Sequence, residues 1–162
     1  MEYLKGEKEK DAIYWMGKAS DIAQRALCQN AKYGAVIVNN AEIVGEGYNA
    51  PPLDSEENRT CNQDFGPGKP KFDRTCCVHA EWRAVMDVFR KNPKKLKGSK
   101  IYVVKLDENG EIKKLGKPFC TVCSRLTLDV GISKFILWHH EGICEYSTKE
   151  YDKISYHYVH VV

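Results

Sequence analysis

Two short stretches carry most of the information in this sequence: Cys76-Cys-Val-His-Ala-Glu81 and, further along the chain, Pro118-Phe-Cys-Thr-Val-Cys123. Together they supply one imidazole, a pair of closely spaced thiols and one carboxylate. Because zinc prefers nitrogen and sulfur ligands, His79, Cys120 and Cys123 are candidate zinc ligands. Three protein ligands leave the fourth position of a tetrahedral zinc ion to water, whereas a structural zinc site normally has a fourth side chain.

Glu81 suggests a chemical role beyond metal binding. Bound zinc brings the pKa of its water to about 7, and a neighbouring carboxylate can take a proton from that water and pass it to a substrate. On a regular helix, residues two apart point away from each other, so His79 and Glu81 can converge only where the helix begins. One alternative is a structural zinc knot. The other is a thioredoxin-like redox pair of Cys120 and Cys123, and this interpretation leaves His79 and Glu81 without a function. The residue types therefore favour a hydrolytic zinc site.

Each of the two stretches begins a predicted helix. Between Val78 and Lys91 the apolar residues recur at helical spacing, and Pro93 and Gly98 end the segment. A further helix is expected from about Cys120 to Gly131. The backbone N–H groups and the dipole at its start favour thiolate over thiol, which suits cysteines that bind metal.

The remaining sequence alternates between strand and helix patterns. A first helix is predicted from Asp11, as its cap, to about Asn30, and a last helix from Thr148 to Ser155, capped by Ser147 or Thr148. Short β-branched runs and turn signals predict strands at Gly34–Val38, Glu42–Tyr48, Lys100–Lys105, Glu111–Leu115 and Lys134–Trp138. Residues 51–73 have the composition of a long loop, which in a compact domain is usually functional. The alternation predicts one α/β layered domain over residues 1–162.

The composition excludes several classes of protein. The 162 residues are 43% hydrophobic and 29% charged, as in globular proteins and unlike disordered chains. No run approaches the roughly 20 apolar residues that span a bilayer, and the first residues lack a secretory pattern, so no membrane partner is expected. Seven cysteines, an odd number, favour free or metal-bound thiols in the reducing cytoplasm. The net charge of +3 does not favour a polynucleotide substrate.

The order and spacing of these features resemble the cytidine and deoxycytidylate deaminase superfamily, and most of all its deoxycytidylate branch. An H-x-E sequence followed by P-C-x-x-C is the signature of zinc-dependent nucleobase deaminases. Outside that signature, the resemblance rests on Trp15-Met16, Gly34–Val38, Gly45–Asn49 with Pro51, Asp129–Ile132 and Phe135–Trp138. It extends from about Trp15 to about Tyr156, which is most of the chain.

The resemblance implies a three-layer α/β fold, with a mixed sheet of about five strands and helices on both faces. It also implies zinc binding by the three candidate ligands and proton transfer by Glu81. Asn49 would contact the sugar or the base of the substrate, and the backbone of Ala80 would face the base carbonyl. Members of the superfamily commonly form homo-oligomers, so a second copy of the chain is an expected partner.

The implied reaction removes the exocyclic amine from a free nucleobase-containing metabolite, first of all deoxycytidylate to give deoxyuridylate and ammonia. Cytidine, guanine and a pyrimidine precursor of riboflavin are alternative substrates. A hypothesis of another class is a non-catalytic, zinc-stabilised binding module derived from a deaminase. The small-molecule partner expected of the enzyme is a nucleotide or nucleoside.

Three features depart from the family pattern. Phe119 stands between the proline and the first cysteine of the pair. Trp82-Arg83 follows Glu81, where the branch often has small or amide residues. The segment Leu106–Lys117 lengthens the link between a strand and the cysteine helix, and can reshape the rim of the pocket or an oligomer contact.

Two further groups of residues have alternative interpretations. Cys61, Cys76 and Cys77 either form a second, structural zinc site or are free buried thiols. Arg83 and the lysines between residues 91 and 100 either bind a phosphate or form a solvated face.

Overall fold

The computed structural model describes residues 1–61, 76–114 and 117–157 of the chain. The helices are α1 (Glu7–Ala23), α2 (Ala80–Lys91), α3 (Thr121–Asp129) and α4 (Thr148–Ser155). The strands are β1 (Glu2–Tyr3), β2 (Tyr33–Asn39), β3 (Glu42–Tyr48), β4 (Lys100–Leu106), β5 (Ile112–Lys113), β6 (Lys134–His139) and β7 (Gly142–Ser147). Parts of two predicted segments lie outside the described residues, namely 62–73 of the long loop and 115–116 of the extension.

All of these strands belong to one mixed sheet. Six of them follow the order β1-β7-β6-β4-β2-β3, and β5 pairs with β4 beside this row. The pair β4 and β6 is parallel, and the other pairs are antiparallel. A parallel pair needs a crossover connection, and the chain between β4 and β6 makes one through α3.

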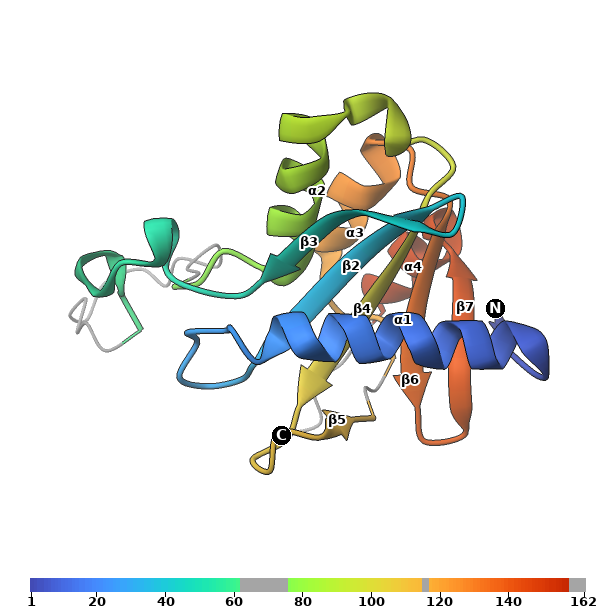
Figure 1. Cartoon of the computed structure of the whole chain (residues 1–162), viewed down its shortest axis with the longest axis horizontal. Coiled ribbons are helices and arrows are strands. Elements are labelled where there is room, and N and C mark those ends of the chain that lie inside the picture. The colour runs from blue at the N-terminus through green and yellow to red at the C-terminus, as the bar shows by residue number, and fades with distance from the viewer. Residues whose placement is uncertain (62–75, 115–116, 158–162) are drawn as a thin grey trace.

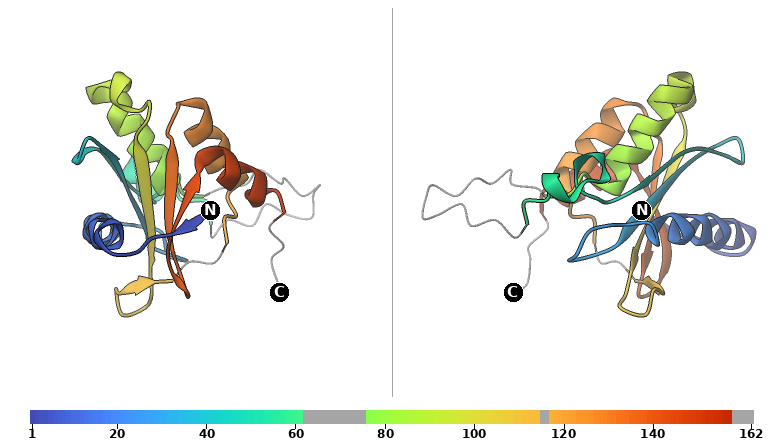
Figure 2. Two further views of the ribbon diagram at one scale, coloured as in Figure 1. Left: turned by 90° about the vertical axis from the view of Figure 1, so that its right-hand side faces the viewer. Right: turned by 60° about the vertical axis from the view of Figure 1, so that its left-hand side comes forward.

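Helices cover both faces of the sheet. α1 lies across one face, and α2, α3 and α4 lie on the other (Figures 1 and 2). Side chains alternate along each strand, so that Val36 and Val38 of β2 pack in the core under α1, while Ala35 and Ile37 pack in the core under α2. The predicted three-layer α/β fold is confirmed.

In the described residues the sheet has seven strands rather than the predicted number of about five, because β1 and β7 extend one edge. β1 is only two residues long, and it is a strand because Glu2 and Tyr3 pair with Glu145 and Cys144 of β7. β7 itself pairs along its whole length with β6. Pairing of such distant segments depends on the folded sheet, and a two-residue strand has no compositional signal.

α1 begins and ends earlier than predicted. It starts at Glu7 rather than Asp11, after Gly6 with φ of 61°. Its first turn is polar and escapes a search for apolar periodicity, although Glu and Lys are good helix formers. After Ala23 the chain tightens into a shorter turn, in which the Ala26 N–H donates to the Ala23 carbonyl at 3.0 Å. The residues from there to Asn30 therefore lie outside the helix, and Cys28 and Asn30 line the cavity described below.

α2 lies close against β3 because of Gly47. A Cβ atom at this position would be 2.1 Å from the carbonyl oxygen of Ala80. Just after β3, Ala50 and Val78 exchange backbone hydrogen bonds of 2.8 and 3.3 Å. These contacts hold the start of α2 against the end of β3.

Candidate metal centre and active site

The three predicted zinc ligands converge at the starts of two helices. His79 precedes α2 with extended backbone, and Cys120 and Cys123 occupy the cap and the first turn of α3. Nδ1 of His79 is 3.1 Å from Sγ of Cys123 and 3.5 Å from Sγ of Cys120. Within the described ranges, this is the only group of three or more His, Cys, Asp or Glu residues whose ligand atoms all lie within 4.8 Å of one another.

The local backbone explains this convergence. Sγ of Cys120 accepts the N–H of Cys123 at 3.3 Å, so Cys120 caps α3 as a serine or aspartate would. The spacing of three residues then places both sulfurs on one side of the first turn. Glu81 lies in the first turn of α2. His79 and Glu81 both lie where α2 begins, and both line the cavity described below.

Burial and mutual hydrogen bonds shift the pKa values of this group. The hydrogen bond with Cys123 lowers the pKa of Cys120 to about 4, although burial acts in the opposite direction. A hydrogen bond to Cys120 raises the pKa of His79. Burial raises the pKa of Glu81, whose side chain belongs to a residue only 7% exposed. A buried carboxyl with a raised pKa is better suited than an ordinary one to exchange protons with a substrate in neutral solution.

The donor atoms fit zinc. One imidazole nitrogen and two sulfurs form a set that zinc prefers and that magnesium or calcium does not. The environment of Cys120 favours the thiolate, which is the form that binds metal. Glu81 lies beside this compact group and is not a member of it.

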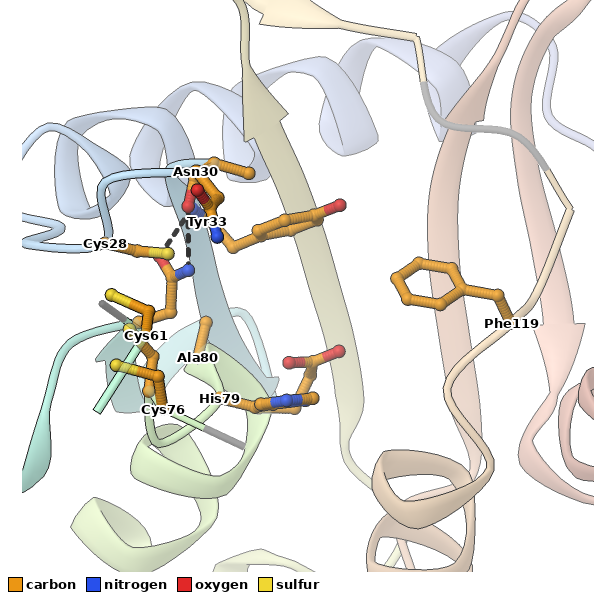
Figure 3. A pocket seen from close by; sticks show the side chains of 12 residues that line it. Cys28, Asn30, Tyr33, Cys61, Cys76, His79, Ala80 and Phe119 are labelled. Atoms are coloured by element: carbon orange, nitrogen blue, oxygen red, sulfur yellow. Dashed lines mark hydrogen bonds between the residues drawn. The ribbon is translucent and has the colours of Figure 1, made fainter. Parts of the chain in front are cut away.

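A cavity adjoins His79, one of the predicted zinc ligands, and its volume of about 310 Å³ is within the size range of small-molecule sites. His79, Ala80 and Glu81 contribute to its lining. Tyr33 and Phe119, which also line it, stand on opposite sides (Figure 3). The residue that interrupts the family's P-C pattern therefore places an aromatic ring in the cavity wall.

Asn49 lies in this wall and is 7% exposed. Its Oδ1 accepts the N–H of Tyr33 at 2.8 Å, and its Nδ2 donates to the carbonyl of Ala31 at 2.8 Å. The side chain thus holds the segment before β2 in place, which is the turn-forming role that asparagine commonly has. Contact of Asn49 and of the Ala80 backbone with a substrate stays a prediction.

Four residues that line the cavity were missed by the sequence analysis, namely Cys28, Asn30, Ala31 and Tyr33. Cys28 comes from the segment after α1, and Tyr33 begins β2. Tyr33 directly precedes the predicted strand Gly34–Val38, so the sequence could have indicated that this residue lies at the start of that strand. No spacing rule connects Cys28 with the cavity, because the fold brings it there.

The guanidinium group of Arg83 already has partners within the protein, so it is not available to bind a phosphate. Its guanidinium donates to Asp54 at 2.7 Å and to the carbonyl of Pro51 at 2.9 Å. It also lies 5.1 Å from the centre of the Tyr48 ring, and the hydroxyl of Tyr48 donates to Asp54 at 2.6 Å. Arg83 therefore clamps the segment after β3 onto α2.

Several of the lysines near residues 91–100 are also paired with carboxylates: Lys91 with Asp87, Lys95 with Glu42 and Lys100 with Glu145.

The proposed second zinc site is not assembled in the described residues. Cys61, Cys76 and Cys77 all line the cavity, but they do not form a second compact group of three ligands there. Sγ of Cys76 instead accepts the backbone N–H of Thr60 at 3.3 Å. Hydrogen bonds of this kind, acting against burial, lower the pKa of Cys76 to about 7.

A buried carboxylate beside a His/Cys/Cys group, at a cavity in a three-layer α/β fold, defines a zinc-dependent hydrolase of the deaminase class. The family model described as the cytidine and deoxycytidylate deaminase zinc-binding region matches residues 9–139, and the chain belongs to this family.

Comparison with individual proteins indicates which branch of this family the chain resembles most. The deoxycytidylate deaminase of Mycobacterium phage D29 is 30% identical over an alignment of 130 residues, which covers 76% of this chain and 90% of the phage protein. Among solved structures, the dCMP deaminase of cyanophage S-TIM5 in apo form has a TM-score of 0.58 at 21% identity, over 79% of this chain and 82% of that chain. The cytidine deaminase of Burkholderia pseudomallei has a TM-score of 0.57 at 16% identity, over 86% of this chain and 94% of that chain. The structures share the fold, and the phage D29 sequence supports the deoxycytidylate branch.

Proposed function

We propose that the chain hydrolyses deoxycytidylate to deoxyuridylate and ammonia. The observation that carries this proposal is the buried Glu81 beside the compact His79, Cys120 and Cys123 group at a cavity of small-molecule size. The 30% sequence identity with the phage D29 deoxycytidylate deaminase supports a cytosine base and a deoxynucleotide as the substrate.

In this proposal His79, Cys120 and Cys123 would hold zinc, a Lewis acid that would make water acidic enough to lose a proton near neutral pH. Glu81 accepts that proton and donates it to the ring nitrogen beside the amino-bearing carbon. A C–O bond forms at this carbon. Glu81 then carries a second proton from the added hydroxyl to the amino group, the C–N bond breaks, and ammonia leaves. The low exposure of Glu81 keeps bulk water away from these transfers.

The test replaces Glu81 by glutamine, which keeps the shape of the side chain and removes its basicity. We expect turnover of deoxycytidylate, followed by the loss of cytosine absorbance, to fall at least about 100-fold, because a general acid–base residue contributes on this scale. Zinc content, measured by elemental analysis, should stay at the wild-type level. Loss of the metal in this variant would contradict the role of Glu81 as a proton carrier.

The same assay separates the alternatives. Cytidine, guanine and a pyrimidine precursor of riboflavin are compared with deoxycytidylate as substrates, with and without a chelator. A wild-type protein that keeps zinc and turns over none of these compounds would be the non-catalytic binding module.

Other features of the enzyme stay predictions. We expect one domain over residues 1–162, and we expect the chain to assemble into a homo-oligomer. The exposed apolar side chains of Met86, Phe89 and Val122 on α2 and α3 support the second expectation. The reducing cytoplasm stays the expected compartment, on the ground of the odd number of cysteines. In the part of the chain that the structure describes, no helix has the length and apolar character needed to cross a bilayer.

A further inference from the structure

Another cavity lies on the face of the sheet that α1 covers, opposite the face that carries α2 and α3 (Figure 2). Its volume of about 380 Å³ is within the size range of small-molecule sites. Leu4, Val38 and Tyr102 line it and belong to the core under α1. Neither Glu81 nor the candidate zinc ligands line it, so this cavity is separate from the one proposed for catalysis.

Two well-defined elements build the walls of this cavity. Lys8, Asp11 and Trp15 follow one another at intervals of three and four residues, which places them on one side of α1. The turn between β2 and β3, residues 39–41, also lines the cavity. Nδ2 of Asn39 donates to the carbonyl of Lys95 at 2.7 Å and so holds this turn in place. The cavity thus has a fixed shape before any ligand arrives.

The hydroxyl of Tyr102 is a polar group at this cavity without a partner. The residue is only 5% exposed, and within the described ranges its hydroxyl forms no hydrogen bond. Burial raises the pKa of this hydroxyl, and the charges of Glu145 and Asp11 raise it further. Both carboxylates also line the cavity. The phenol is therefore protonated and offers a donor and an acceptor to a ligand, whose hydrogen bond would offset the cost of burying an unpaired polar group.

The unpaired charge at this cavity is negative. Two of the lining groups neutralise each other, since Nζ of Lys100 lies 3.0 Å from the carboxylate of Glu145. Nζ of Lys8 lies 3.5 Å from the carboxylate of Glu2. Asp11, by contrast, takes part in no ion pair among the residues that the structure describes. A ligand that carries a positive charge therefore complements the cavity better than an anion does.

We propose that this cavity binds a small organic cation, an ammonium group on a short carbon chain, which pairs with Asp11 and hydrogen-bonds to the hydroxyl of Tyr102. The half-buried ring of Trp15 offers an aromatic face to the cation and apolar surface to the chain. A divalent metal ion fits less well, because Glu145 is engaged by Lys100 and a protonated phenol is a poor ligand for hard cations. The proposal does not depend on the deaminase function.

The experiment is an NMR titration of the isotope-labelled, zinc-loaded full chain with butylammonium chloride, followed at the indole N–H of Trp15. Butan-1-ol and sodium butyrate are the neutral and anionic probes of matched length. We expect butylammonium to bind at least about tenfold more tightly than either, because a hydrogen bond to a charged group is worth about this much.

Variants identify the two groups that recognise the cation. Asp11→Asn should weaken the binding of butylammonium at least about tenfold, and Tyr102→Phe, which keeps the ring, about fivefold. The matched control is Asp21→Asn, which removes an exposed carboxylate of the same helix that does not line the cavity, and it should leave the binding unchanged. Turnover of deoxycytidylate should be the same in Asp11→Asn as in the wild-type protein, so the failure of one proposal is distinguishable from the failure of the other.

Each other outcome has a defined meaning. Absence of saturable binding by butylammonium would overturn the site, and so would equal weakening by Asp11→Asn and Asp21→Asn. Tighter binding of butyrate that Lys100→Gln abolishes would show an anion site and refute the proposed charge of the ligand. Binding of butylammonium that Tyr102→Phe leaves unaltered would remove the hydroxyl from the site and contradict the proposal.

Discussion

Single residues decide how accurately the proposed catalytic groups are placed, and Gly47 is the clearest case. It carries no side chain at the point where β3 meets the first turn of α2, the turn that contains Glu81. A Cβ atom there would lie 2.1 Å from the Ala80 oxygen and 2.4 Å from the Ala84 nitrogen. Both are backbone atoms, so the clash could be relieved only by moving the helix.

We therefore expect Gly47→Ala to lower the free energy of unfolding by more than about 2 kcal/mol, as overpacking against rigid backbone does. Turnover should fall as well, because the displaced helix carries His79 and Glu81. Denaturant unfolding and the deaminase assay measure the two effects.

Gly17→Ala is the matched control for this substitution. A Cβ at Gly17 meets no atom within 4 Å, and the position lies inside α1. Alanine should there raise the stability by up to about 1 kcal/mol through its better helix propensity. Equal effects of the two substitutions would show that the close contact at Gly47 does not matter.

At the scale of secondary-structure elements, the site depends on two helix starts that come from separate parts of the chain. α4 steadies one of them, because Asp152 accepts hydrogen bonds from Ser124 at 2.8 Å and from Arg125 at 3.3 Å, both on α3. The start of α2 is held by the backbone pairing of Ala50 with Val78. A metal ion shared by His79 and the two cysteines would join these two supports.

Removal of the metal with a chelator should therefore loosen the starts of α2 and α3 more than the rest of the molecule. We expect the free energy of unfolding to drop by about 3 kcal/mol or more, the effect of losing a ligand present well above its Kd. Hydrogen exchange should accelerate in residues 79–84 and 120–126 and stay unchanged in α1, which serves as the internal control. Uniform acceleration throughout the chain would argue against a metal that links these two helices.

At the scale of the whole molecule, charged side chains tie neighbouring strands together on the sheet. The carboxylate of Glu145 in β7 lies 3.0 Å from Nζ of Lys100 in β4 and 2.9 Å from Nζ of Lys134 in β6. Burial raises the pKa of Glu145, but the hydrogen bonds and charges of Lys134 and Lys100 outweigh this effect, and its pKa lies below the ordinary value of 4.5.

This lowered pKa predicts a pH-dependent contribution to stability. The contribution is complete above the ordinary value and is lost as the pH falls through the lower pKa of the folded state. Glu145→Gln should thus be less stable than the wild-type protein at neutral pH, and the difference should shrink in acid. Denaturant unfolding of both proteins over a pH series measures this difference, in which effects common to the two proteins, such as metal loss, cancel. A difference that stays constant from neutral to acid pH would contradict the assignment.

Local chemistry accounts for the parts of the structure that could be predicted. The compact group of candidate zinc ligands was identifiable because imidazole and thiol are the groups that zinc selects, and helix starts favour thiolate. The helix at Thr148–Ser155 was predicted with Ser147 or Thr148 as its cap, and the cap is Ser147, whose Oγ accepts the N–H of Glu150. These features depend on residues that are close together in the sequence.

The sequence by itself determined the donor set, the alternation of strands and helices, and the family to which the chain belongs. Only the tertiary structure decided that β1 pairs with β7, that Arg83 is engaged by Asp54, and that Asp11 and Tyr102 share a cavity under α1. The physical reason is that ligand preference and periodicity act over a few neighbouring residues, whereas these contacts join distant segments whose proximity is selected by the packing of two cores on one sheet.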